Sequence, residues 1–305
     1  MTDPFTVPTW SFAAAGFLAG LGFLLWMAFP AARARYARKV AREQGLDLDA
    51  RFAPIVTPYF ARRMRLTALG LMGVCAVVLV LVALGVPLPF EGSEAWFAGM
   101  WAIIPLITVG GGIGTIVSGL RWPRTTTGES STGRLTPPSR ADVVMPWEEL
   151  LQVSVVALGA VLPVIVIATG LDGGRPEAIA ALVLGCLGVI ATFGWRIAAD
   201  RVLRSRPISG DAPALAWSDA LRSDAVRFGM PVPAALATSA YALVLGTLAV
   251  ALESSGNRFG GVIMMGGVAV ILVGFAAVTI GQLVTGASRR WQRRLHPSLV
   301  DGGLA

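Results

Sequence analysis

The residues that most often carry chemistry are scarce in this sequence and stand far apart. Among 305 residues there is one His, His296 near the C-terminus, and two Cys, Cys75 and Cys186, in separate apolar stretches. Paired axial histidines for haem and His- or Cys-rich zinc sites are therefore excluded, and a Ser-His-Asp arrangement would need His296, which has no motif around it. We interpret His296 as a solvated tail residue and both cysteines as small apolar side chains. Lys39, the single lysine, lies outside the apolar stretches, which excludes a retinal Schiff base, and we expect no cofactor and no metal.

The carboxylates that could serve as general acids or bases flank two of the apolar stretches on the same side. They are Asp142, Glu148, Glu149 and Asp200. Glu148 and Glu149 stand where a helix should begin, and a helix N-terminus favours negative charge. We interpret them as helix-start residues. The alternative is a metal or general-base role.

The elements that must position these residues are apolar helices. The chain is 55% hydrophobic, only 14% charged, and has a mean hydropathy of +0.69, whereas soluble domains are about 25% charged. A helix needs about 20 apolar residues to cross a bilayer. The sequence predicts an all-α polytopic membrane protein, a single bundle of seven transmembrane helices, with spans at 11–29, 66–86, 98–120, 150–170, 178–198, 231–252 and 261–284.

The basic residues are distributed unevenly among the segments between these spans. Segments 30–65, 121–149, 199–230 and 285–305, with Arg196, hold 23 of the 25 Lys and Arg and 12 of the 18 acidic residues, a net charge of +11, against −4 elsewhere. Basic segments remain in the cytoplasm. We therefore predict an N-terminus outside, a C-terminus in the cytoplasm, a largely flexible cytoplasmic loop at 121–149 and a basic cytoplasmic tail at 285–305, in the bacterial inner membrane. The excess positive charge reflects this asymmetry and attraction to anionic lipid, with no nucleic-acid partner.

Glycines cluster in two of the predicted spans. Gly110 and Gly114 form a G-x-x-x-G pair in the third span, and Gly266, Gly267 and Gly274 lie in the seventh. Small residues let helix backbones approach closely in lipid. We predict that these glycines serve helix packing. A locally unwound substrate site, as in transporters, is the alternative.

Two prolines lie inside the third and fourth spans, at similar depth in the predicted outer half of the membrane. Because proline has no N–H, Pro105 and Pro163 leave the carbonyls of Trp101 and Gly159 without their helical donors. In lipid such a carbonyl must find another donor. We predict that both spans bend there and frame an outward-facing crevice for a ligand or partner, lined by Trp101, Pro105, Thr108, Gly159 and Pro163. The alternative is two tolerated kinks in a packed bundle.

Two segments outside the spans also have helical patterns. Segment 31–45 is basic and is expected to continue the first span into the cytoplasm. In Ala214–Phe228 one apolar stripe at helical spacing faces away from most of the charges; it comprises Trp217, Leu221, Ala225 and Phe228, opposite Asp219, Arg222, Ser223 and Arg227. This division predicts a short helix lying along the inner membrane interface, with its apolar face on the headgroup boundary or on the bundle.

The stretch AWSDALRSDAVRF at Ala216–Phe228, together with the hairpin layout and the preference for Arg over Lys, resembles uncharacterised multi-pass membrane proteins of high-GC actinobacteria. The resemblance implies a location and no activity, and no functional residue follows from it. We predict a protein without an evident catalytic site, a permease-like or accessory subunit acting in membrane lipid with a protein partner or as a homo-oligomer. The alternatives are a small-solute channel or uniporter without membrane carboxylates, and a lipid-modifying enzyme that uses the acids at the inner interface.

Overall fold

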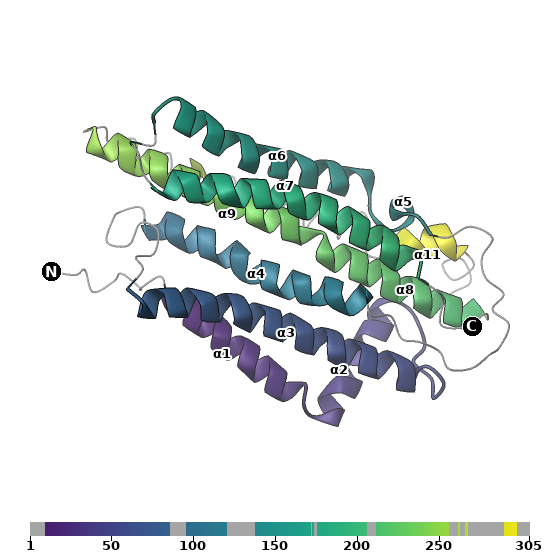
Figure 1. Ribbon diagram of the computed structural model, residues 1–305. Helices are drawn as coiled ribbons and strands as arrows, with labels where there is room; N and C mark the ends of the chain where they lie inside the picture. The colour runs from purple at the N-terminus through teal and green to yellow at the C-terminus, as the bar shows by residue number, and fades with distance from the viewer. Residues whose placement is uncertain are drawn as a thin grey trace.

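The computed structural model describes residues 10–85, 96–120, 138–171, 173, 176–205, 212–255, 262, 266–267 and 290–297. Within these ranges the chain forms helices and turns and no strand, so the all-α prediction is confirmed. The long helices run side by side as one elongated bundle (Figure 1); they are α1 (Trp10–Trp26), α3 (Ala53–Ala83), α4 (Trp96–Leu120), α6 (Pro146–Ala168), α7 (Pro176–Leu203) and α9 (Pro231–Ser254).

Five of these helices begin and end within five residues of predicted spans, whereas α3 begins at Ala53, 13 residues before the predicted start of the second span at 66. Four described helices are long and apolar enough to cross a membrane, and α1 with the helix that follows it makes a fifth if that bent pair is one span. The predicted seventh span, 261–284, falls almost wholly outside the described residues. A membrane bundle of helices is thus supported, while the count of seven and the orientation stay predictions.

Helix α9 occupies the centre of the bundle. It packs against α4 on one side and against α6 and α7 on the other, while α3 packs between α4 and α1. Most side chains of α9 are buried, whereas α6 and α7 expose apolar faces that include Leu158, Ile190 and Phe193. Such faces are suited to contact with lipid chains.

Glycine contacts set the closest helix approaches. A methyl group at Gly110 would overlap the Gly70 carbonyl of α3, and one at Gly114 would overlap the backbone at Leu66. The G-x-x-x-G pair therefore lies directly on the α3 backbone, which is how small residues support helix association in lipid. In the predicted seventh span, Gly267 abuts Leu245 of α9, nothing lies within 4 Å of a methyl group built at Gly266, and Gly274 lies outside the described residues.

The basic segment after α1 does not continue that helix. It forms a separate helix, α2 (Pro30–Glu43), and the two helices meet at an angle of 98°. Pro30 has no N–H to bond the Trp26 carbonyl, and α1 ends at Trp26. The apolar face of α2, which includes Ala37 and Val40, is then buried against α3 and α8. The expectation of one continuous helix is therefore wrong.

The predicted helix at 214–228 exists, but its placement differs from the prediction. Helix α8 (Ala212–Gly229) leads into α9, and the two together form one run, Ala212–Ser254, along the bundle axis (Figure 1). Two short helices, α5 (Arg140–Val143) and α11 (Arg290–Leu295), pack at the same end of the bundle. The placement of α8 along the interface is therefore wrong; of the two surfaces predicted for its apolar face, the bundle rather than the headgroup boundary is the one that it contacts.

Candidate functional site at the charged end of the bundle

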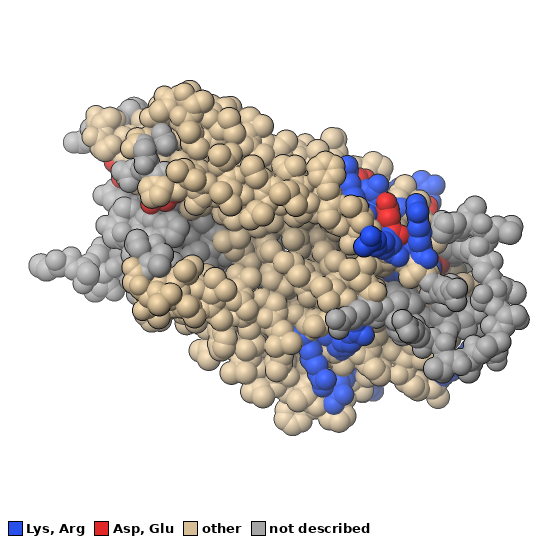
Figure 2. Space-filling model, viewed as in Figure 1, with Lys and Arg blue, Asp and Glu red and all other residues tan. Residues whose placement is uncertain are grey.

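The basic side chains gather at one end of the bundle, and acidic side chains are present at both ends. On the face drawn in Figure 2, Lys and Arg lie toward the end that carries α2, α5, α8 and α11, while the middle of the bundle is free of charge in the described part. We call this end the cap: α2, α5, α8 and α11 with the first turns of α3 and α6 and the end of α7. The predicted flexible loop and basic tail both contribute ordered parts to it, since α5 and α11 belong to 121–149 and 285–305.

Helix α8 forms the core of the cap and is buried on its polar side. Ser218, Asp219, Arg222 and Ser223 are all buried, and the Trp217 indole N–H donates to the Asp47 carbonyl at 3.0 Å. Phe228, expected in the buried stripe, is instead 51% exposed. The predicted division of α8 is thus wrong for its polar side, which the tail and the end of α7 cover through His296 and Ser205, whereas Trp217 and Leu221 pack on α2 and the start of α3 as an apolar stripe should.

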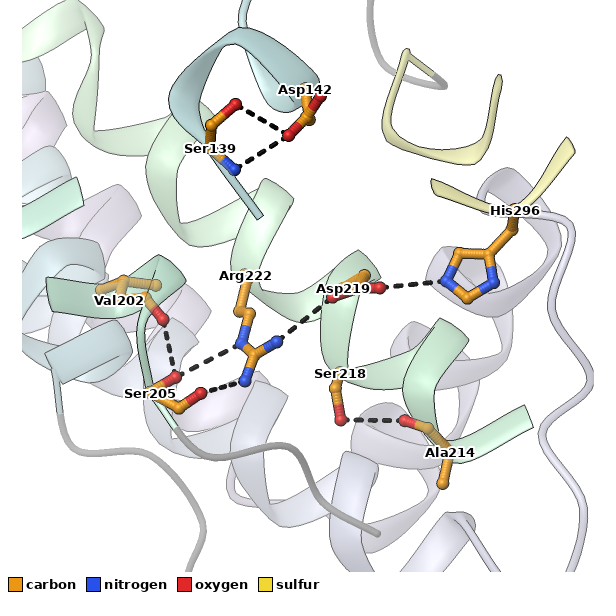
Figure 3. A network of polar contacts seen from close by, with 9 residues as sticks. All are labelled: Ser139, Asp142, Val202, Ser205, Ala214, Ser218, Asp219, Arg222 and His296. Carbon is orange, nitrogen blue, oxygen red and sulfur yellow. Dashed lines mark hydrogen bonds and ion pairs between the residues drawn. The ribbon is translucent and has the colours of Figure 1, made fainter. Parts of the chain in front are cut away.

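A polar network links α8 to the C-terminal tail through Asp219 (Figure 3). Arg222 Nη1 donates to Asp219 Oδ1 at 3.2 Å, and Asp219 Oδ2 lies 3.0 Å from His296 Nε2. Arg222 also donates to the carbonyl of Ser205, at the end of α7. The side chain of His296 is only 11% exposed. The interpretation of His296 as a solvated tail residue is therefore wrong.

Helix α11 is held in the cap by three further contacts. The indole N–H of Trp291, which is fully buried, donates to Gln44 Oε1 at 3.0 Å, and Gln292 donates to the Gln44 carbonyl. Arg290 Nε donates to the Ala141 carbonyl at 2.8 Å. The tail thus joins the turn after α2 to α5 and α8, three segments far apart in sequence.

One ion pair ties α8 to α3. Asp224 binds Arg63, a side chain only 1% exposed, and the Arg63 guanidinium lies 4.1 Å from the centroid of the Phe228 ring. This stacking explains why Phe228 faces outward from α8: its ring covers the cation. Burial raises the pKa of the nearby Tyr36 phenol on α2, and the charge of Arg63 offsets this only in part, so that Tyr36 contributes a neutral hydroxyl.

A second ion pair ties α8 to α6. Arg227 Nη2 donates to Glu148 Oε1 at 2.8 Å, and Glu148 Oε2 accepts the backbone N–H of Met145 at 2.8 Å. Glu148 therefore serves the N-terminus of α6, as expected for a helix-start carboxylate. Its ion pair with a helix almost 80 residues away along the chain was not expected from the sequence.

A cleft opens at the rim of the cap, between α5 and the ends of α6 and α7. Its volume is about 400 Å³, and it is lined by residues 138–141 with Glu149, Asp200, Leu203 and Arg204. Arg140 bridges Glu149 at 3.1 Å and Asp200 at 3.0 Å, and Arg196 binds Glu149 at 3.2 Å. Arg140 thus brings Glu149 and Asp200 together at the cleft, and Asp142 accepts the N–H and O–H of Ser139, a lining residue, whereas Glu148 bonds to Arg227.

Most buried hydroxyls of the apolar helices bond within their own helices; exceptions are Thr115, which also bonds to Thr67 of α3 at 3.0 Å, and Ser118, whose hydroxyl bonds to no other described residue. Thr192 donates to the Gly188 carbonyl at 2.9 Å, Ser239 to Ala235 at 3.1 Å, and Thr247 to Leu243 at 2.9 Å. Such bonds are the usual fate of Ser and Thr in membrane helices. Gln152 differs: it is buried, and neither of its amide atoms bonds to another described residue.

The predicted crevice is closed on the α6 side. Gly159 and Pro163 are buried, and a Cβ at Gly159 would lie 2.7 Å from that of Ala237 on α9. Gly185 of α7 packs against the Gly159 carbonyl, the group that Pro163 leaves without a helical donor. On α4 the side chains of Trp101 and Thr108 lie outside the described residues. The crevice around Pro105 stays a prediction.

No family model, curated protein or solved structure matches this chain. Within the described ranges no three His, Cys, Asp or Glu side chains are arranged to hold a metal ion. The function must therefore be argued from the cap and its cleft.

Proposed function

We propose that this chain is a multi-pass membrane subunit that acts through a partner protein, and that the cap is its working surface. The observation that supports this is the set of buried polar contacts that bind α8 to other segments: ion pairs to α3 and α6, and the contact of Asp219 with His296 of the tail. Buried charges cost several kcal/mol each in desolvation and are poor devices for stability alone. Their value is to hold distant segments in one arrangement, which a recognition surface requires.

We place the cap in the cytoplasm and the N-terminus outside. The net charge of +11 on the segments predicted to be cytoplasmic, against −4 on the others, supports this orientation. The membrane is then a bacterial inner membrane, as the resemblance of Ala216–Phe228 to actinobacterial membrane proteins also suggests. An accessory or permease-like subunit, alone or as a homo-oligomer, would meet its partner on this cytoplasmic face.

A solute carrier is less well supported than a partner subunit. A carrier exposes its solute site to one side of the membrane and then to the other, and this site would need polar groups within the bundle that are free to bind the solute. The hydroxyls of Thr192, Ser239 and Thr247 are engaged by their own helices. The Ser118 hydroxyl and the Gln152 amide bond to no other described residue, but they lie on α4 and α6, on opposite sides of α9.

One observation favours a second function, a lipid-modifying enzyme: the rim cleft gathers arginines around Glu149 and Asp200 at an interface. A general base must be free to reach the proton that it removes. Glu149 is held by both Arg140 and Arg196, and Asp200 by Arg140. These carboxylates are better suited to positioning the arginines than to proton transfer.

Site-directed cross-linking in native membranes tests the proposal. In a variant with Cys75 and Cys186 changed to Ala, a photo-reactive label is attached to Arg42→Cys, an exposed position of α2. It should give one protein adduct of discrete mass. The same label on Ile190→Cys, on the apolar face of α7, should give lipid adducts only. Equal protein adducts at both positions, or none at Arg42→Cys, would contradict a partner at the cap. Solute uptake by liposomes containing the pure protein would favour the carrier instead.

A further inference from the structure

The rim cleft lies where the apolar surface of the bundle meets the charged cap. On α7, Phe193, Ile197, Asp200 and Arg204 succeed one another at helical spacing, so an exposed apolar stripe runs directly into the cleft. Leu150, next to Glu149 at the start of α6, is exposed beside it. In Figure 2 the mixed positive and negative side chains at this end directly adjoin uncharged surface. With α6 and α7 crossing a bilayer, the cleft lies at the depth of the headgroups.

One of the guanidinium groups at the cleft is not paired with a carboxylate of the described residues. Arg140 and Arg196 are both engaged by the carboxylates of Glu149 and Asp200. Arg204 lines the cleft, is exposed, and forms no ion pair with any residue of the described ranges. Of the two arginines that line the cleft, Arg140 is thus neutralised by carboxylates and Arg204 is not, so that one negatively charged phosphodiester would supply the missing counter-charge. Arginine suits this partner because its fork of N–H donors can bind two phosphate oxygens at once.

We propose that the cleft binds the headgroup of one anionic phospholipid from the surrounding leaflet. Its phosphodiester lies on Arg204 and the outer edge of Arg140, and its acyl chains run along Phe193 and Ile197. The carboxylates of Glu149 and Asp200 hold Arg140 and Arg196 in place. Because these arginines neutralise them, they attract the ammonium of a phosphocholine headgroup only weakly, and the selectivity comes from the positive charge of Arg204. This site goes beyond the proposed function, since it needs neither a protein partner nor a reaction.

Native mass spectrometry of the whole, delipidated protein in detergent tests the site. Phosphatidylglycerol and phosphatidylcholine with identical acyl chains are titrated separately, and the first should bind more tightly. Losing one charge-assisted contact should make Arg204→Gln bind phosphatidylglycerol about tenfold more weakly. Arg204→Lys, which keeps the charge but not the fork, should fall between the two. Arg38→Gln is the matched control: it removes the same charge from an exposed position of α2, and it should bind phosphatidylglycerol like the wild type.

Three results would overturn the proposal. Equal weakening by Arg204→Gln and Arg38→Gln would mean diffuse attraction to the whole basic surface. Equal affinity for the two lipids would mean that headgroup charge is not recognised. Displacement of the lipid by millimolar inorganic phosphate would mean a free-phosphate site without an acyl contribution. Because both variants replace exposed side chains, their melting temperatures should match the wild type and are measured first.

Discussion

The ion pair between Glu148 and Arg227 should be the most sensitive single point in the cap. Glu148 is 3% exposed and accepts from both Arg227 and the Met145 backbone N–H, each at 2.8 Å. Replacing Glu148 by Ala removes the carboxylate that pairs with the largely buried Arg227 guanidinium. It also removes the acceptor of the Met145 backbone N–H at the start of α6. Losing one partner of a buried pair costs about 3–5 kcal/mol, and losing a helix N-terminal contact costs about 1 kcal/mol.

The expected loss lies at the lower end of that range. Arg227 keeps a bond to the Val143 carbonyl at 3.2 Å, and its side chain is 15% exposed, so it is not wholly stranded. We expect Glu148→Ala to lower the free energy of unfolding by about 3 kcal/mol. At roughly 2–4 °C per kcal/mol for domains of 150–250 residues, the midpoint should fall by about 6–12 °C.

The assay is thermal unfolding in detergent, followed by circular dichroism and tryptophan fluorescence. Lys39→Ala is the matched control: Lys39 also pairs with a carboxylate, Glu43, at 3.7 Å, but is 66% exposed. Exposed pairs contribute about 0–1 kcal/mol, so its midpoint should hardly move. A double-mutant cycle with Arg227→Ala should give a coupling energy of at least about 1 kcal/mol. If Glu148→Ala unfolds no earlier than Lys39→Ala, the ion pair does not organise the cap.

Three further predictions follow from the bundle and its ends. A reporter fused after Ala305 should be cytoplasmic, and Ser93→Cys should react with an impermeant reagent from outside; labelling in inverted vesicles alone would reverse the predicted orientation. Gly110→Leu should disrupt the contact with the α3 backbone and prevent recovery of folded monodisperse protein, whereas Gly73→Ala, where nothing lies within 4 Å of a methyl group, should be tolerated; equal recovery of both would refute the close approach. His296→Ala removes a bond to Asp219 and should speed hydrogen exchange in α11 by about tenfold; unchanged exchange would show that the other contacts of α11 suffice.

Local sequence patterns predicted most of the helices but few of the contacts in the cap. Apolar runs of sufficient length identify α1, α3, α4, α6, α7 and α9, because lipid selects helices by hydrophobicity and length, both of which are local properties. The role of Glu148 at a helix start was also readable, since a cap depends on residues next to it in the chain. The ion pair between Glu148 and Arg227 could not be predicted, because the spacing of residues within one helix does not indicate which distant helix packs against it.

What the sequence by itself determined is the all-helical bundle, the positions of its apolar helices and the separation of charge between its ends. The tertiary structure decided the rest of the cap. The stripe on α8 predicted a helix whose apolar face rests on the headgroups or on the bundle; the fold places that face on α2 and the start of α3, and it covers the polar face with the tail and the end of α7. The same packing buries His296 against Asp219. A buried charge requires a partner, and only the assembled fold determines which residue provides it.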